Sequence, residues 1–204
     1  MTGSQSAQAW SLRRALGLLA GAGMALFSAL TIQHYFAANY PVSIFEGSFC
    51  DINAFFNCNS SAFSSISAVA GVPIGWFGMA LGALVAFGAL FPSPALERTT
   101  RPLAALNVLG VIALLLFSVL ALGSLCLLCT GYYVFSFLAL GVMWAGRDRG
   151  ASLLRAWLPA PLVLGVFGVV TLGGAFGVRE YHVVRRQAQS GGGAARVVSQ
   201  FFSL

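Results

Sequence analysis

The chain contains four cysteines, and they form two pairs along the sequence. Cys126 and Cys129 belong to the stretch CLLC, and Cys50 and Cys58 enclose the stretch DINAFFN. Residues three apart on a helix are neighbours on one face, and the start of a helix favours the reactive thiolate. Two such pairs predict thiol–disulfide exchange, in which a thiolate of one pair attacks the disulfide of the other.

Other interpretations of these cysteines stay open on sequence alone. Cys126 and Cys129 could instead be two buried cysteines that act only as small apolar side chains. The Cys50 and Cys58 pair is also compatible with a static disulfide staple. A zinc site made of all four thiolates is a third alternative, although one tight pair plus one widely spaced pair is not the usual ligand spacing.

The elements that must position the cysteines are predicted to be transmembrane helices. The chain is 58% hydrophobic and only 8% charged, whereas soluble domains are roughly 25% charged. Its apolar residues form runs of about 20, which match the thickness of a bilayer. The sequence therefore predicts an all-α integral membrane protein with five spans: Ala15–Ala37, Ile74–Phe91, Leu103–Leu122, Leu125–Trp144 and Pro161–Val178.

Charge predicts the orientation of these spans. The net charge is +6 and every basic residue is arginine; we interpret these arginines as orientation signals, and nothing in the chain resembles a nucleic-acid-binding module. Arginines precede the first span and lie between the second and third and the fourth and fifth, which places these segments in the cytoplasm. The arginines of the C-terminal tail disagree, but charges after the last span usually weigh less.

Both cysteine pairs are then expected on the extracytoplasmic face. The connection 38–73 and the turn 123–124 contain no arginine. They are also separated by two spans, and a chain that crosses twice returns to the face from which it started. For a bacterial inner membrane that face is an oxidising compartment.

The electrons need an acceptor. The sequence has no obvious nucleotide-binding fingerprint, P-loop or histidine-rich metal set. A membrane quinone fits, because it is apolar and accepts two electrons.

On these residues the sequence resembles the bacterial branch of the vitamin K epoxide reductase family. The resemblance covers about residues 15–145. It depends on these features: Cys50-Asp51, Cys58, the Ser64-Ser65 pair, GVPIGWFG at 71–78, and Cys126-Leu-Leu-Cys129 followed by Thr130 and Tyr133.

The resemblance implies a four-helix bundle around a quinone site, with a fifth, peripheral transmembrane helix. It implies that Cys129 reacts with the quinone, menaquinone or ubiquinone, and that Cys126 exchanges with the loop. Cys58 would pair with Cys126, and Cys50 would meet the external partner first. That partner would be a thioredoxin-like periplasmic or extracytoplasmic protein, whose oxidation supports disulfide formation in exported proteins.

Three further residues take roles from the resemblance. Ser64 or Ser65 would help to place the loop, and Tyr133 would line the quinone pocket. Animal members of the family hydrogen-bond the quinone through an asparagine near the start of the second span, and Gly71–Ile74 here contains none. Quinone reduction is therefore expected rather than epoxide reduction.

The chain is then divided into four parts. Residues 1–14 form a cytoplasmic N-terminus, and 15–145 the redox bundle with its outer cysteine loop at 38–73. Residues 146–178 hold a cytoplasmic loop and the fifth helix. Residues 179–204 are a Gly-rich tail or linker, so that the thioredoxin-like partner is a separate protein or a missing fused domain.

Two competing functions remain. One is a second class of membrane oxidase that also uses two cysteine pairs and a quinone. In that class the cysteine pair on a helix would lie near the first loop rather than after the third span, so the order of the pairs here argues against it. The other is a non-catalytic scaffold or a transporter with a disulfide-stapled outer loop, although transporters usually carry polar groups inside their spans. The small-residue pairs Gly17/Gly21 and Gly78/Gly82 predict close helix packing within the chain.

Overall fold

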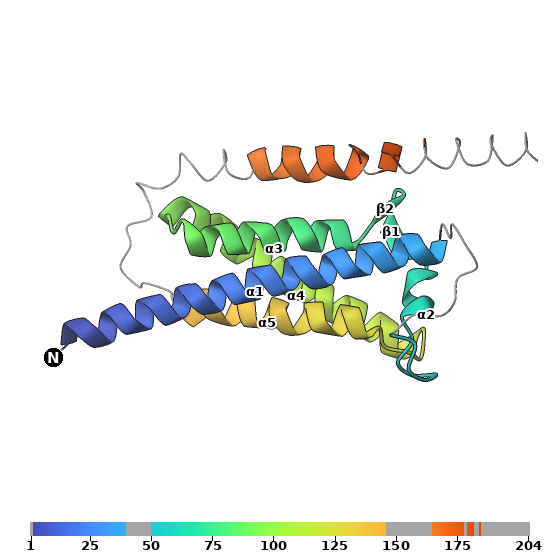
Figure 1. Cartoon of the computed structure of the whole chain (residues 1–204), viewed down its shortest axis with the longest axis horizontal. Coiled ribbons are helices and arrows are strands. Elements are labelled where there is room, and N and C mark those ends of the chain that lie inside the picture. The colour runs from blue at the N-terminus through green and yellow to red at the C-terminus, as the bar shows by residue number, and fades with distance from the viewer. Residues whose placement is uncertain (1, 40–49, 146–164, 178, 182–183, 185–204) are drawn as a thin grey trace, which may run out of the picture.

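The computed structural model describes residues 2–39, 50–145, 165–177, 179–181 and 184. Four long helices run side by side (Figure 1): α1 (Thr2–Asn39), α3 (Gly75–Leu90), α4 (Pro94–Leu120) and α5 (Leu127–Ala145). Helix α1 packs on α3 and α5, and α4 packs on the same two helices. The first four predicted spans correspond to these helices, and the predicted all-α membrane bundle is confirmed.

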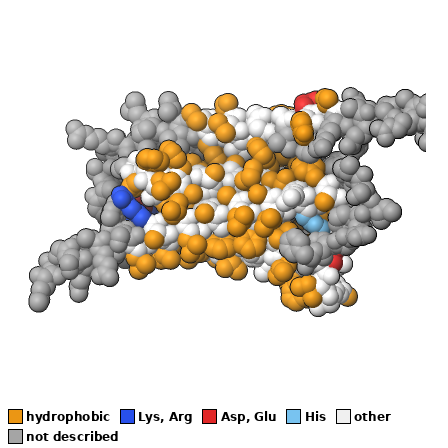
Figure 2. All heavy atoms as spheres, viewed as in Figure 1, with side chains coloured by type: hydrophobic (Ala, Val, Ile, Leu, Met, Phe, Trp, Pro, Cys, Tyr) orange, Lys and Arg blue, Asp and Glu red, His pale blue; other side chains and the backbone are white. Residues whose placement is uncertain are grey.

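Three of these helices are long and apolar enough to cross a membrane. They are Leu12–Asn39 within α1, Leu96–Leu120 within α4, and all of α5. Helix α3 is equally apolar in character but has only 16 residues, which span roughly 24 Å at 1.5 Å per residue. Apolar side chains spread over the visible surface of the bundle (Figure 2), as expected where lipid rather than water is the solvent.

Glycines allow α1 and α3 to approach closely. A Cβ atom on Gly82 would lie 2.6 Å from the backbone nitrogen of Ala25, and Gly21 meets the backbone of Ala86 in the same way. Such contacts leave no room for any side chain. The predicted role of these small residues in packing within the chain is confirmed.

Helix α4 begins earlier than the sequence predicted. The expected start was Leu103, after Pro102, but the helix starts at Pro94 and contains Pro102. The side chain of Ser93 accepts a hydrogen bond from the backbone N–H of Leu96 and caps the helix. Glu97 in the first turn also favours the start of a helix, because its charge complements the helix dipole.

The predicted outer loop is folded over its described residues. It contains helix α2 (Cys58–Ala62) and an antiparallel hairpin of β1 (Ala68–Val69) and β2 (Val72–Pro73). The two turn residues, Ala70 and Gly71, both have positive φ angles, 52° and 81°, as a tight two-residue hairpin requires. Residues 40–49 of the predicted loop lie outside the described residues.

Residues 165–177 form a further helical segment beside α3, drawn in orange in Figure 1. Trp76 of α3 donates a hydrogen bond from its indole N–H to the backbone oxygen of Thr171, at 2.9 Å. This segment corresponds to the predicted fifth span. Residues 146–164, which contain the predicted cytoplasmic loop and the start of the predicted fifth span, lie outside the described residues, as does the tail from 185 onward.

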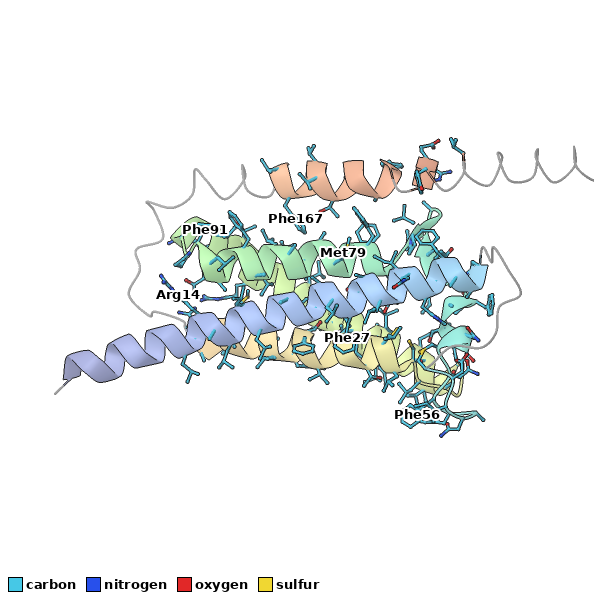
Figure 3. The ribbon with its side chains drawn as sticks, viewed as in Figure 1. Arg14, Phe27, Phe56, Met79, Phe91 and Phe167 are labelled. Carbon is cyan, nitrogen blue, oxygen red and sulfur yellow. A yellow bond between two sulfur atoms is a disulfide. The ribbon has the colours of Figure 1, made fainter. Side chains whose placement is uncertain are left out.

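The charged and cysteine-bearing ends of the bundle are opposite each other. Arg14 lies at one end and Phe56 of the cysteine loop at the other (Figure 3). At the arginine end, Arg13 pairs with Glu97 at 2.7 Å and Arg101 pairs with the same carboxylate at 3.0 Å. The bundle therefore presents one strongly charged end and one end built around sulfur.

Candidate active site

The cysteine loop is attached by its backbone to the segment that precedes Cys126. The N–H of Leu125 donates to the oxygen of Phe55 at 2.6 Å, and the N–H of Asn57 donates to the oxygen of Leu125 at 3.0 Å. Together these bonds make a parallel bridge between Phe56 and Leu125. Beyond this bridge the two segments lie close together, and the first leads to Cys58 and the second to Cys126.

Polar side chains fold the loop around Cys58. One carboxylate oxygen of Asp51 accepts hydrogen bonds from the backbone N–H groups of Cys58, at 2.9 Å, and Asn59, at 3.3 Å. The other oxygen accepts from the side-chain amide of Asn59 at 2.5 Å. Asn57 caps α2 by accepting from the N–H of Ser60 at 3.0 Å. The start of α2, and with it Cys58, is thereby fixed.

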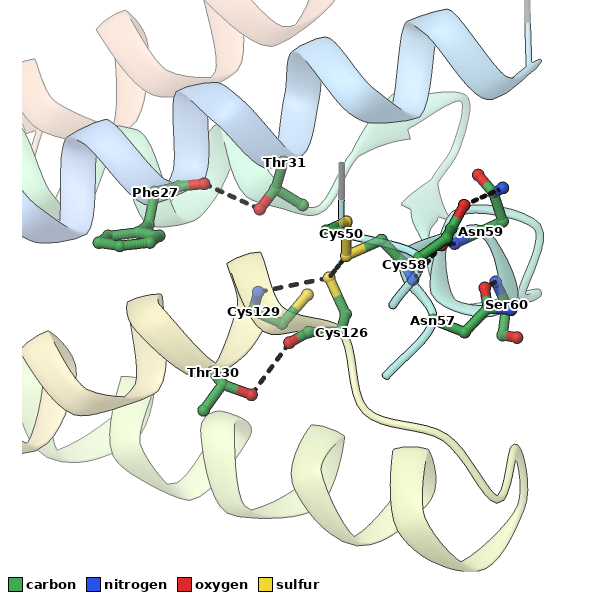
Figure 4. The surroundings of a disulfide bond; sticks show 11 residues. Phe27, Thr31, Cys50, Asn57, Cys58, Asn59, Ser60, Cys126, Cys129 and Thr130 are labelled. Atoms are coloured by element: carbon green, nitrogen blue, oxygen red, sulfur yellow. Dashed lines mark hydrogen bonds between the residues drawn. A yellow bond between two sulfur atoms is a disulfide. The ribbon is translucent and has the colours of Figure 1, made fainter. Parts of the chain in front are cut away.

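The four sulfur atoms lie in one place, although they come from distant parts of the chain (Figure 4). Cys50 and Cys58 form a disulfide bond, and Cys126 and Cys129 are free thiols. The sulfur of Cys126 is hydrogen-bonded to the sulfur of Cys58 at 3.2 Å. Reacting atoms that stand about 3–3.5 Å apart are close enough for near-attack geometry.

Of the two free thiols, Cys126 is the one placed to react with the loop disulfide. It immediately precedes α5, and its sulfur accepts the backbone N–H of Cys129 at 3.4 Å. The pKa of the Cys126 thiol is lowered, chiefly by a hydrogen bond from the Cys129 thiol and then by backbone N–H groups of Cys129 and Leu128. The lower pKa favours the thiolate, which is the attacking form in disulfide exchange.

Little of this sulfur cluster is exposed. Cys50 and Cys58 have no exposed surface, and Cys126 is 2% exposed. Leu128 packs into the same cluster, and Phe27 and Leu30 of α1 cover it. Any reaction with a second protein therefore requires the loop to open locally.

Two cavities meet at Cys129. The larger has a volume of about 390 Å³, within the usual range for small-molecule sites, and its lining is overwhelmingly apolar. The smaller, of about 70 Å³, lies toward the cysteine loop and is lined by Cys58 and Cys126 among others. Cys129 and Tyr133 line both cavities, so Cys129 stands between the sulfur cluster and the larger apolar space.

The other predicted site residues are distributed unevenly. Tyr133 is buried and lines both cavities. Ser64 lines the smaller cavity, and its hydroxyl donates to the backbone oxygen of Ser61 at 2.8 Å. Ser65 is exposed and is not among the residues that line either cavity. The roles predicted for these residues stay predictions.

Sequence reasoning missed two sets of residues at this site. Asp51 entered the sequence analysis only as the neighbour of Cys50, whereas its carboxylate binds the backbone at Cys58. Asn107 of α4 received no role from the sequence, yet it lines the larger cavity and bonds Tyr132 of α5. A lone amide in an apolar run is the signal that could have indicated the second.

Residues 14–144, more than half of the chain, match the sequence model of the vitamin K epoxide reductase family. Neither a curated protein nor a solved structure gives a match.

Proposed function

Because the chain belongs to the vitamin K epoxide reductase family, an oxidoreductase family of the membrane, we propose that it is a thiol:quinone oxidoreductase. In this proposal it reoxidises a thioredoxin-like partner on the extracytoplasmic face of the inner membrane and reduces menaquinone or ubiquinone in the bilayer. The reaction would support disulfide formation in exported proteins.

One observation carries the proposal: the sulfur of Cys126 lies 3.2 Å from the sulfur of Cys58. These residues are 68 positions apart in the sequence, and a static staple between Cys50 and Cys58 needs no third sulfur beside it. Cys129 on the other side of the pair borders an apolar cavity of about 390 Å³. The two contacts together support a path for electrons from the loop to the cavity.

The first reaction oxidises the partner. A partner thiolate attacks Cys50 of the loop disulfide, and Cys58 leaves as a thiolate. The second partner thiolate then attacks the mixed disulfide and releases Cys50. The partner loses two electrons, and the loop becomes a dithiol.

The second reaction moves the electrons into the bundle. The Cys58 thiolate attacks the sulfur of Cys126 in a Cys126–Cys129 disulfide, and Cys129 leaves as a thiolate. Cys50 then attacks Cys58, which restores the loop disulfide and releases Cys126. The bonding pattern of the structure, with the loop oxidised and both CLLC thiols free, is the one this reaction produces.

The third reaction reduces the quinone. Two electrons and two protons pass from Cys126 and Cys129 to a quinone in the larger cavity, which leaves as the quinol, and a Cys126–Cys129 disulfide forms. Cys129 would contact the quinone because it lines that cavity, whereas Cys126 does not. Tyr133 would line the site beside it.

A cross-linking experiment tests the relay. In the double variant Cys50→Ser/Cys129→Ser only Cys58 and Cys126 retain thiols, and we expect a mild oxidant to join them almost completely. In the matched variant Cys58→Ser/Cys129→Ser the remaining pair is Cys50 and Cys126, which we expect to join far more slowly. Mass spectrometry of non-reduced peptides identifies the bond, and equal rates in the two variants would contradict the proposed order.

Quinone reduction is measured on the purified protein in detergent, with dithiothreitol as the electron donor and ubiquinone-1 or menadione as the acceptor. We expect Cys129→Ser to abolish quinone reduction and Cys126→Ser to abolish transfer from the loop. The control is Leu109→Ala, at a position of α4 that is 65% exposed and outside both cavities, and it should keep full activity. Full activity in both cysteine variants would remove the enzymatic proposal.

A further inference from the structure

The larger cavity contains a polar network that the proposed electron path does not use. The hydroxyl of Tyr132 donates to the side-chain oxygen of Asn107 at 2.6 Å. The amide nitrogen of Asn107 in turn donates to the hydroxyl oxygen of Ser136 at 3.0 Å. Asn107 comes from α4 and the other two residues from α5, and Asn107 and Tyr132 both line the cavity.

The hydrogen-bonding capacity of Asn107 is only partly used. A side-chain amide has two N–H groups and an oxygen with two lone pairs. The bonds to Tyr132 and Ser136 use one N–H and one lone pair. The second N–H is left at the edge of a cavity whose lining is overwhelmingly apolar, where a donor without a partner is costly.

A quinone supplies what this donor needs. Each quinone oxygen accepts hydrogen bonds and donates none, so it can pair with an N–H group but not with a second acceptor. The hydroxyl of Tyr132 is already committed as a donor, and Ser136 is not among the residues that line the cavity, which leaves the Asn107 amide as the donor that this network offers there. After reduction the quinol hydroxyl becomes a donor, and the oxygen of Tyr132 retains lone pairs that can accept it.

The network also lies at a suitable distance from the reactive thiol. Cys129, Tyr132 and Ser136 occupy positions i, i+3 and i+7 of α5 and so share one face of the helix. At 1.5 Å per residue, Tyr132 lies roughly 4.5 Å and Ser136 roughly 10 Å farther along the axis than Cys129. A quinone ring with one edge at Cys129 therefore extends its other end toward Asn107.

We propose that Asn107 donates a hydrogen bond from its amide nitrogen to the quinone oxygen remote from Cys129, with Tyr132 and Ser136 fixing the orientation of the amide. This inference depends on the proposed function, because it assumes that a quinone occupies the larger cavity. It assigns a binding role to Asn107 and a positioning role to Tyr132 and Ser136.

The competing explanation is that the network only joins α4 to α5. Interhelical hydrogen bonds in membranes contribute modestly to stability, and a purely structural link would not change the affinity for quinone. The two explanations therefore predict different measurements for Asn107→Leu, which keeps the size of the side chain and removes its hydrogen bonds.

Quinone binding is measured directly, without turnover, by the quenching of tryptophan fluorescence as menadione or ubiquinone-1 is added to the protein in detergent. Trp76 is a suitable reporter because it bonds the backbone of Thr171, which lines the cavity. We expect Asn107→Leu to weaken binding roughly three- to tenfold, the usual range for one net hydrogen bond. Leu109→Ala, on the exposed side of α4, should bind as the wild type does.

Kinetics and spectroscopy separate the two roles. For Asn107→Leu we expect KM for the quinone to rise by the same factor with kcat nearly unchanged, and the Cys58–Cys126 cross-link to form at the normal rate. In the infrared spectrum of bound menadione, a hydrogen-bonded carbonyl stretch at lower frequency should be present in the wild type and absent in the variant. An unchanged Kd, KM and carbonyl frequency would overturn the inference.

Other outcomes are equally decisive. If Asn107→Leu does not fold, Tyr132→Phe is used: it releases the amide oxygen, and an unchanged quinone Kd in that variant overturns the proposed network. If the wild type binds neither quinone, both the inference and the quinone part of the proposed function are wrong. If the wild type reduces quinone and loses this activity in Cys129→Ser, while Asn107→Leu behaves as wild type, only the inference is wrong.

Discussion

Replacing Asp51 by alanine removes the carboxylate that holds the backbone of Cys58. In the oxidised loop the Cys50–Cys58 disulfide also restrains this residue. When the loop is reduced that restraint is gone, and the bonds to Asp51 become the main local connection that keeps Cys58 at the start of α2. We therefore expect Asp51→Ala to slow the attack of Cys58 on Cys126.

The size of the effect follows from the lost hydrogen bonds. Bonds to a charged group contribute about 1.5–3 kcal/mol each, and the lower value applies here because Asp51 is half-buried. The bonds from the Cys58 N–H and the Asn59 side chain then total about 3 kcal/mol, which corresponds to a rate roughly 100-fold lower. Asp51→Asn keeps an oxygen for Cys58 but loses the bond to Asn59, so we expect a decrease of about tenfold.

The assay uses the Cys50→Ser/Cys129→Ser background, in which only the Cys58–Cys126 bond can form. The rate of cross-linking in dilute oxidant is followed by quenching with a thiol reagent and mass spectrometry. Ile52→Ala is the matched control, since its side chain is 63% exposed and adjacent in sequence. The exchanged pair Asp51→Asn/Asn59→Asp restores a carboxylate–amide bond and should recover part of the rate.

The reasoning fails if Asp51→Ala cross-links within about twofold of the background rate while Ile52→Ala does the same. In that case the loop position would be set by the Phe56–Leu125 backbone bridge alone. A loss in Asp51→Ala that the exchanged pair does not recover at all would instead indicate that the carboxylate must stand at position 51, where it accepts the backbone N–H groups of Cys58 and Asn59.

Three further predictions address packing, acidity and the last described helix. Gly82→Ala places a Cβ against the backbone of α1. It should lower the free energy of unfolding by about 3 kcal/mol and Tm by roughly 6–12 °C. The control Gly141→Ala, whose Cβ meets nothing within 4 Å, should leave Tm unchanged. Cys129→Ala removes the main hydrogen bond that lowers the pKa of Cys126, so the pH midpoint of Cys126 alkylation by iodoacetamide should move upward, and a downward or absent shift contradicts this. Trp76→Phe removes the bond to helix 165–177, and hydrogen exchange in that segment should become about fivefold faster, with no change in α5.

The sequence by itself determined the membrane character of this protein and predicted its thiol chemistry. Runs of apolar residues and the spacing of Cys126 and Cys129 are local properties, and they predicted the helices and the reactive pair without any knowledge of packing. The order of the two pairs around the spans also carried the resemblance to the vitamin K epoxide reductase family, to which the chain belongs.

Helix boundaries were harder to predict from the sequence, because they depend on capping residues, which a hydrophobicity pattern does not identify. Ser93 moved the start of α4 to the other side of Pro102. In the cysteine loop, nothing in the sequence distinguished the polar residues that fold it, yet Asp51 and Asn57 bind the backbone around α2. The sequence alone cannot distinguish a carboxylate or amide that binds the loop backbone from one that is only solvated.

Only the tertiary structure decided which sulfur faces which, and what lies behind them. The contact between Cys58 and Cys126 depends on a backbone bridge at Leu125 that joins segments far apart in the chain. The meeting of Asn107 with Tyr132, across α4 and α5, depends on the relative rotation of two helices. Neither is encoded in a local pattern, because both result from how complete helices pack against one another.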